Sequence, residues 1–241
     1  MIYYRNFADV FAYFKKVLHL MITVHHLENS RSHRILWLLE ELSVDYDIEF
    51  YERDPDSKLA PPELQKIHPL GKSPVVTDGE RTVAESAVII EYLLDEYGDG
   101  QLRPEPGTDA FAQYRYWMHY AEGSAMTPLF LRIVFSELPR QAPWPVSSLL
   151  KVVSRGVESE VIKPRLATHV DYWEEHLGES EYFAGADFTA ADIQMSVPLE
   201  GAAAGVDPEK YPAVQALVER LKKRDAYRAA VECGGGLSMD L

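Results

Sequence analysis

The chain has 241 residues, 46% of them hydrophobic, which is enough to form a sizeable core in one or two domains. Its 38 acidic and 24 basic residues leave a net charge of -14 at pH 7, which argues against a nucleic-acid-binding surface. The single cysteine, Cys233, excludes an intramolecular disulfide and a thiolate-rich metal cluster, and it favours a reducing, cytoplasmic location.

The first 20 residues form an N-terminal extension with a helical pattern of its own. Apolar residues recur at helical spacing and charged residues fill the positions between them, which predicts one amphipathic helix. Such a helix can lie on a membrane surface, dock on a partner or pack on the body of the protein. We favour packing, or a true start at Met21, over membrane association. No apolar run approaches the roughly 20 residues that span a bilayer.

The sequence pattern of residues 22–51 predicts a strand, a helix and a second strand. The stretch "ITVHHL" is short and β-branched, "SRSHRILWLLEEL" carries its apolar residues on one helical face, and "VDYDIEFY" alternates apolar and acidic residues. Strands that are joined by a crossover helix lie parallel, so these three elements form a βαβ unit.

A short helix and a β-hairpin follow. The helix is expected in "APPELQKI", with its prolines in the tolerated first turn. The runs "PVVT" and "RTVA" flank Asp78-Gly79, which is a strong signal for a tight antiparallel hairpin. The next helix, "SAVIIEYLLDEY", begins at Ser86 and ends before Gly98. A βαβ unit followed by a hairpin and a helix is the thioredoxin-like architecture, so we assign residues 21–98 to such a domain.

Residues 99–108 gather glycine and proline and lose periodicity, which predicts a linker. From 109 to 241 the chain is predicted to be all-helical, with two long helices and three shorter ones. The segment 138–146, "LPRQAPWPV", lies between the long helices and is predicted to continue neither of them; it is a plain loop or, through Trp144, the roof of a pocket. The fold class is therefore α/β plus all-α.

The stretch from Ser73 to Ser86 contains the first candidate binding residues. Pro74 opens a strand at the position where thioredoxin-like domains carry a cis proline, which would turn the backbone of Ser73 outward to pair with an extended peptide. Ser86 stands at a helix N-terminus, where amides favour an anion, and Glu85 can accept from an ammonium group. This pair suits an amino-acid head group. The alternatives are a trans proline and a plain helix cap at Ser86.

The turn "NSRS" before the first helix contains the candidate catalytic residue. Thiol-disulfide enzymes carry a cysteine pair here, and this chain has none, so redox exchange by the protein itself is not expected. Ser30 can instead donate a hydrogen bond to a thiolate carried by the ligand, with Ser32 as the rival donor or a helix cap. His25 and His26 are neighbours on a strand, point to opposite faces and are not expected to share a metal ion.

Four motifs in chain order, "SRSHRILWLLEEL", "HPLGKSPVV", "AESAVIIEYL" and "FAGADFTAADI", resemble the cytosolic glutathione S-transferases, specifically their serine-type Gtt-like branch of fungi and bacteria. The resemblance extends from residue 21 to about residue 232. It implies a glutathione-binding first domain, a helical domain that supplies much of the hydrophobic co-substrate site, and a homodimer. It also implies that Thr189 and Asp192 form a capping motif that serves folding.

The resemblance assigns roles to individual residues. Ser30 would stabilise the glutathione thiolate, the backbone of Ser73 would pair with the cysteinyl unit, and Glu85 with Ser86 would hold the γ-glutamyl head. Lys72 and Lys58 would face the glycyl carboxylate. For the co-substrate pocket, which has no transferable signature, Tyr116 and Tyr120 are our candidates because partly polar aromatic residues suit such a site.

These observations predict an enzyme that activates the thiol of bound glutathione for attack on a small hydrophobic electrophile, with peroxide reduction as a related activity. Glutathione would be a co-substrate, and neither a metal nor a prosthetic group is expected. The alternative is a non-catalytic member of the family that serves as a protein-binding or regulatory module. The constellation of Lys72, Glu85 and Ser86 favours the enzyme, since a module without a ligand has no need for it.

Overall fold

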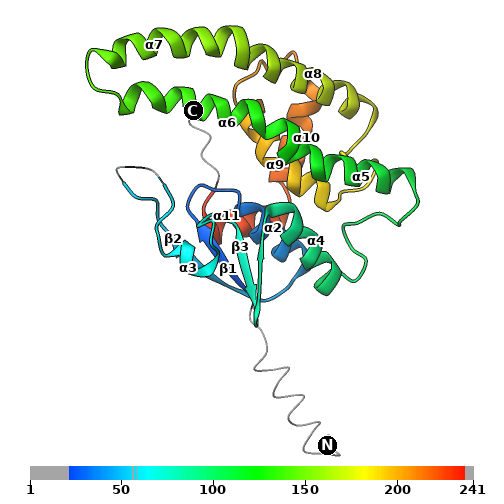
Figure 1. The fold of residues 1–241 in the computed structure, drawn as a ribbon. Helices are drawn as coiled ribbons and strands as arrows, with labels where there is room; N and C mark the ends of the chain where they lie inside the picture. The colour runs from blue at the N-terminus through cyan, green and yellow to red at the C-terminus, as the bar shows by residue number, and fades with distance from the viewer. Residues whose placement is uncertain (1–21, 56, 58, 237–241) are drawn as a thin grey trace, which may run out of the picture.

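The computed structural model describes residues 22–55, 57 and 59–236 (Figure 1). The predicted helix within residues 1–20 and the candidate Lys58 lie outside the described residues. The molecule has two parts, a small sheet with its helices and a larger helical part that lies over it in Figure 1.

The sheet has four strands in the order β2-β1-β3-β4. They are β1 (Ile22–Leu27), β2 (Tyr46–Tyr51), β3 (Val75–Asp78) and β4 (Arg81–Ala84). β1 and β2 are parallel, with Val24 opposite Ile48, whereas β3 runs antiparallel to both β1 and β4. The predicted βαβ unit and hairpin are therefore confirmed.

Three helices belong to the sheet part: α2 (His33–Leu42), α3 (Leu64–Ile67) and α4 (Ser86–Tyr97). α2 is the crossover between the parallel strands, and nearly all of its side chains are buried, Trp37 among them. It contacts α4, α9 and α11, which explains why an apolar sequence continues around most of its circumference.

The rest of the described chain is helical, after a segment between Tyr97 and Asp109 that contains neither helix nor strand. Its elements are α5 (Asp109–Tyr120), the π-helical turn η1 (Ala121–Ala125), α6 (Met126–Gln141), α7 (Val146–Val157), the π-helical turn η2 (Glu158–Ile162), α8 (Lys163–Glu179), α9 (Ala190–Ala203), α10 (Pro212–Lys222) and α11 (Asp225–Gly234). The predicted fold class, an α/β domain followed by helices, is confirmed. None of the described helices is both long and apolar enough to cross a bilayer.

The prediction for residues 138–146 was wrong in part. α6 continues through Pro139 to Gln141, and α7 starts at Val146, so the two form an antiparallel pair that was not predicted (Figure 1). Pro139 removes one backbone hydrogen bond, but it sits in the last turn of α6, so only two residues of helix follow it. Trp144 is 84% exposed and does not line a described pocket.

One feature fixes the start of α9 within the helical part, and another joins the two parts of the molecule. The capping box of α9 is present: the Asp192 carboxylate accepts from the Thr189 and Phe183 amides at 2.8 and 2.9 Å, which fixes the start of this buried helix. α11, the last helix, returns to the first part and packs on α2. There the Arg224 guanidinium binds the Glu41 carboxylate through two hydrogen bonds of 2.5 and 2.8 Å.

Candidate functional site

A hollow lies where β3, the end of β4 and the start of α4 meet the turn before α2. We call it the hairpin hollow. Five of the predicted binding residues line it: Lys72, Ser73, Pro74, Glu85 and Ser86. Arg31, His68, Leu70 and Ala84 complete the lining. The structure therefore brings the turn before α2, which contains Arg31, next to the predicted binding residues between Lys72 and Ser86.

Ser73 and Pro74 line the hairpin hollow, and the bond between them is cis, as the sequence suggested. The Ser73 side chain is already used by the fold, since its hydroxyl donates to the His25 carbonyl at 2.9 Å and accepts from the Leu27 amide at 3.2 Å. Any contact of Ser73 with a ligand must therefore come from its backbone.

Glu85 and Ser86 also line the hairpin hollow. Glu85 is the cap residue of α4 and has φ of 73° and ψ of 122°, a conformation that non-glycine residues rarely adopt. Its side chain is exposed, while Ser86, the first residue of the helix, is 5% exposed. Among the described residues no side chain caps α4, so its first amides lack a capping acceptor beside the hairpin hollow. Strain of this kind is commonly retained at binding sites.

The two candidate serines lie side by side at the start of α2. Their hydroxyl oxygens are 2.7 Å apart, and the Ser32 amide donates to the Ser30 hydroxyl oxygen at 3.3 Å. Ser30 is partly exposed, whereas Ser32 is fully buried. Ser32 occupies the cap position of α2, but its side chain makes no capping hydrogen bond. Only Ser30 is therefore placed to meet a ligand directly.

His26 extends this pair into the core. Its Nδ1 atom is 2.9 Å from the Ser32 hydroxyl oxygen, whereas its buried Nε2 atom has no hydrogen-bond partner among the described residues. Burial lowers the pKa of His26 below 6.5, partly opposed by the nearby Gly234 backbone, so the ring is neutral at pH 7. His33, buried nearby, has its pKa lowered further, to about 4, by burial and then by His26 and Arg34.

His25 lies on the other face of β1, as the alternation predicts. Its ring contacts the Tyr51 and Thr77 hydroxyls at 3.0 and 3.2 Å. The described residues contain no group of three side chains suited to hold a metal ion. The contact of His26 with Ser32 was not predicted, because strand alternation indicates only that the two histidines point to opposite faces and not what each one meets.

Two cationic side chains, Arg31 and Lys72, line the hairpin hollow. Lys72 is exposed, and Arg31 binds the Glu122 carboxylate at 2.6 Å. Arg34, which is fully buried, binds the other oxygen of Glu122. Burial alone would raise the pKa of Glu122, but Arg34 and then Arg31 outweigh it and hold that pKa below its ordinary value. Arg31 was not predicted, because its partner comes from the other part of the molecule.

Tyr116 and Tyr120, the candidates for the co-substrate pocket, lie outside the hairpin hollow. They stack on each other with ring centroids 5.5 Å apart on the side of α5 that faces α8. Tyr120 also shares a hydrogen bond with His169. Neither tyrosine lines the hairpin hollow or the larger hollow described next.

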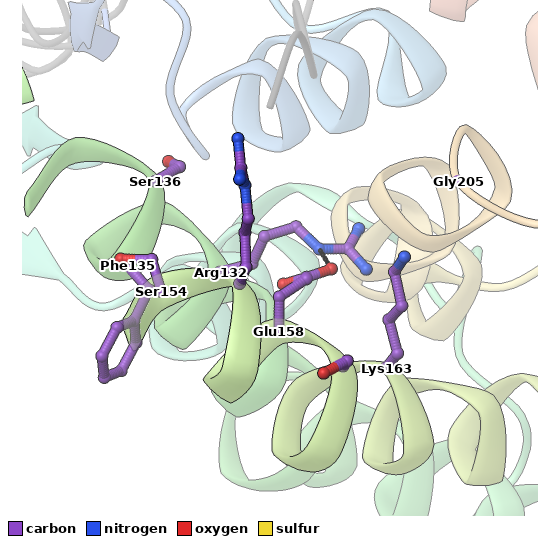
Figure 2. A pocket seen from close by; sticks show the side chains of 9 residues that line it. Arg132, Phe135, Ser136, Ser154, Glu158, Lys163 and Gly205 are labelled. Carbon is purple, nitrogen blue, oxygen red and sulfur yellow. Dashed lines mark ion pairs between the residues drawn. The ribbon is translucent and has the colours of Figure 1, made fainter. Parts of the chain in front are cut away.

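A second, larger hollow lies between α6, α7, η2 and the turn after α9 (Figure 2). We call it the α6–α7 hollow, and its volume is about 570 Å³. Arg132, Phe135, Ser136, Ser154, Arg155, Glu158, Ser159, Lys163 and Gly205 line it. It shares no lining residue with the hairpin hollow.

The fold and the hairpin hollow together define a thioredoxin-like domain with a helical second domain. Residues 20–95 match the model for the N-terminal domain of glutathione S-transferases, and residues 153–229 match the model for their C-terminal domain. These two matches cover most of both parts, so the chain belongs to the glutathione S-transferase family.

Individual relatives agree with this assignment. The chain is 38% identical over 213 residues to glutathione S-transferase 3 of Schizosaccharomyces pombe, covering 88% of this chain and 87% of the relative. It is 32% identical over 222 residues to glutathione S-transferase 1 of Saccharomyces cerevisiae, covering 88% and 94%. A glutathione S-transferase structure from Actinobacillus pleuropneumoniae is 32% identical, with a TM-score of 0.72 and coverage of 91% and 95%.

Proposed function

We propose that the hairpin hollow binds glutathione and that Ser30 stabilises the glutathione thiolate for attack on a small hydrophobic electrophile. The observation that carries this proposal is the meeting of Ser73 with Glu85 and Ser86 at one hollow beside the Ser30 turn. A structural neighbour from Phanerochaete chrysosporium that shares the fold, at 23% identity and a TM-score of 0.70, contains oxidised glutathione.

Each part of glutathione has a chemically suitable partner in this arrangement. The Glu85 carboxylate accepts from the α-ammonium of the γ-glutamyl residue, and Ser86 with the first amides of α4 donates to its α-carboxylate. The backbone of Ser73 pairs with the cysteinyl unit as an added strand would. Lys72 neutralises the glycyl carboxylate, with Lys58 as a second candidate.

The reaction needs little from the protein beyond position and a stabilised thiolate. The thiol proton leaves to solvent, and the sulfur electron pair forms a bond to an electrophilic carbon as the leaving group departs. With a hydroperoxide the thiolate attacks the O–O bond, which yields an alcohol and glutathione sulfenic acid; a second glutathione converts the latter to the disulfide and water. We propose conjugation as the main activity and peroxide reduction as the related one.

The serine and histidine cluster provides the donor. We place the His26 hydrogen on Nδ1, donating to Ser32, because Nδ1 has a hydroxyl partner at 2.9 Å, whereas Nε2 has the Gly234 backbone nearby but no hydrogen bond of normal geometry among the described residues. The Ser32 hydroxyl then donates to Ser30 at 2.7 Å rather than to the Leu27 carbonyl at 3.4 Å. Because Ser30 receives two hydrogen bonds from Ser32, its own hydrogen is free to point outward to the thiolate.

We also propose that the protein acts in the cytoplasm as a homodimer. The single cysteine fits a reducing compartment. Apolar side chains on α6 and α7 are widely exposed, Phe130 at 62% and Leu149 at 66% among them, and such patches favour self-association. Light scattering of the purified protein should give twice the chain mass of 27.4 kDa; a monomer at micromolar concentration would contradict the dimer.

Calorimetric titration with glutathione tests the central proposal. The parent protein should bind glutathione saturably, and the Glu85→Ala, Ser86→Ala double variant should lose the binding, because it removes both side-chain partners of the γ-glutamyl head. Glu80→Ala, an exposed change in the hairpin turn outside the hollow, is the matched control. If the parent fails to bind at millimolar glutathione, the enzyme proposal falls and the non-catalytic alternative takes its place.

A further inference from the structure

Arg31 is a cationic side chain of the hairpin hollow that the proposed glutathione contacts leave unused. Glu85, Ser86 and the first amides of α4 would hold the γ-glutamyl head, and Lys72 would hold the glycyl carboxylate, so both carboxylates of glutathione have partners without Arg31. Arg31 nevertheless lines the same hollow, and its side chain is 43% exposed. It follows Ser30, the proposed thiolate donor, in the turn before α2. A positive charge therefore lies close to the place of the reacting sulfur.

The charge of Arg31 is only partly neutralised within the fold. Its Nη1 atom binds one oxygen of Glu122 at 2.6 Å, and the fully buried Arg34 binds the other oxygen. Burial would raise the pKa of Glu122, but Arg34 and then Arg31 hold that pKa below its ordinary value, so the carboxylate is charged at pH 7. Two guanidinium groups thus share one carboxylate, and the cluster keeps an excess positive charge. Because Arg34 is enclosed in the core, this charge acts on the hollow through Arg31.

Arg31 is also held in place before any ligand binds. Its ion pair with Glu122 joins the turn before α2 to η1 in the helical part, where we expect the hydrophobic co-substrate to bind. A guanidinium has five N–H donors in a planar fork, and among the described residues no hydrogen bond engages Nε or Nη2 of Arg31. Donors that are fixed in advance stabilise a developing negative charge without the cost of reorganisation. Arg31 therefore suits an oxygen that becomes anionic during the reaction.

We propose that Arg31 is a catalytic residue that stabilises negative charge developing on an oxygen of the co-substrate, an inference that rests on the proposed function. The electrophiles that fit are α,β-unsaturated aldehydes and ketones. The thiolate sulfur bonds to the β-carbon, the electron pair of the C=C bond shifts, and an enolate forms with its charge on the carbonyl oxygen, to which Arg31 donates. The α-carbon then takes from solvent a proton equal to the one that the thiol released. No group leaves, and the addition is redox-neutral.

Single-turnover conjugation by the full chain, with enough protein to bind all the glutathione, tests this role. Cinnamaldehyde places the developing charge on oxygen, whereas iodomethane needs no pocket and releases iodide, a weak hydrogen-bond acceptor. Arg31→Met should slow the cinnamaldehyde reaction about tenfold to a hundredfold, less than the roughly hundredfold to thousandfold cost of losing an enclosed donor, because Arg31 is partly exposed. The iodomethane rate, the glutathione affinity and the thiol pKa should stay unchanged.

Two further variants control for charge and for structure. Arg31→Lys keeps the positive charge and should recover part of the cinnamaldehyde rate. Arg81→Met should react as the parent does with both electrophiles, since Arg81 also pairs with a glutamate in the first domain but lies outside the hairpin hollow. Melting curves of all variants separate a lost catalytic group from a lost fold.

The outcomes distinguish this inference from the proposed function. If the parent accelerates neither electrophile over free glutathione, the proposed function is wrong and the role of Arg31 falls with it. If the parent accelerates only iodomethane, or if Arg31→Met slows both electrophiles equally, the role of Arg31 alone is overturned. A raised thiol pKa in Arg31→Met would mean that Arg31 acts on the thiolate, and weaker glutathione binding would mean that it holds glutathione. Either result would also overturn the proposal.

Discussion

At the residue scale, the proposed stabilisation of the thiolate depends on how three side chains are oriented. Ser30, Ser32 and His26 form one hydrogen-bonded chain from the surface to the core, with donor–acceptor distances of 2.7 and 2.9 Å. A neutral histidine at its buried end can fix the direction of both hydroxyl groups. His26 would then be a positioning residue, since it acts on the thiolate only through the two serines.

The first prediction concerns this chain of hydrogen bonds. His26→Leu should raise the pKa of the bound glutathione thiol by about 1 unit, or about 1.4 kcal/mol, because Ser30 is no longer oriented to donate. His26→Asn, whose amide replaces the Nδ1 donor, should largely restore it. Ser30→Ala should raise it at least as much. The measurement is the thiolate absorbance of the glutathione complex as a function of pH.

Glutathione affinity should stay nearly constant in all three variants, which separates this effect from loss of the binding site. His25→Asn is the matched control, since His25 is equally buried but lies on the opposite face of β1 and contacts neither serine. An unchanged thiol pKa in His26→Leu would contradict the positioning role. An unchanged pKa in Ser30→Ala would move the donor to Ser32 or elsewhere.

At the scale of elements, α11 packs on α2 in the first domain, although it follows all the helices of the second domain in sequence. Its packing on α2 requires glycine at position 234. A Cβ atom there would lie 2.2 Å from Leu36 Cδ1 and 3.2 Å from His26 Cε1, and Leu36 is fully buried. Gly234 therefore packs against both the buried Leu36 side chain and the His26 ring, which orients Ser32.

We expect Gly234→Ala to lower the free energy of unfolding by about 1–3 kcal/mol, because a methyl group overpacks a filled core. Chemical denaturation measures the change. Gly156→Ala in α7 is the control: a Cβ atom at this helical glycine would meet nothing within 4 Å, so alanine should stabilise by about 1 kcal/mol or less. Equal effects at the two positions would show that helix propensity, and not packing on Leu36, governs both.

Local patterns explain which elements and site residues could be predicted. The βαβ unit, the hairpin and the Glu85-Ser86 helix start each depend on residues close in sequence, so alternation and turn chemistry suffice. α7 was not predicted although its apolar residues recur at helical spacing, as at Val146, Leu149 and Val153; none of its residues is buried, so this pattern marks an exposed apolar face and not a core contact. Arg31 and Glu122, 91 positions apart, could not be paired because only the tertiary fold brings them together.

At the scale of the whole molecule, one partly buried carboxylate, that of Glu122, joins the two domains next to the proposed site. Glu122 on η1 binds Arg34, which is fully buried in α2, and Arg31, which lines the hairpin hollow. Nε and Nη2 of Arg34 have no hydrogen-bond partner within the described residues, so its charge depends largely on Glu122. The pair therefore couples the stability of the fold to the geometry of the site.

We expect Glu122→Gln to lower the free energy of unfolding by about 3–5 kcal/mol, because it leaves the Arg34 charge buried without compensation. Both domains should unfold together at the lower midpoint, seen as coincident transitions in circular dichroism and tryptophan fluorescence. Glu96→Gln, which breaks the exposed pair with Arg81, should cost no more than about 1 kcal/mol. A loss confined to one domain, or equal losses in the two variants, would mean that the Arg34 pair does not hold the domains together.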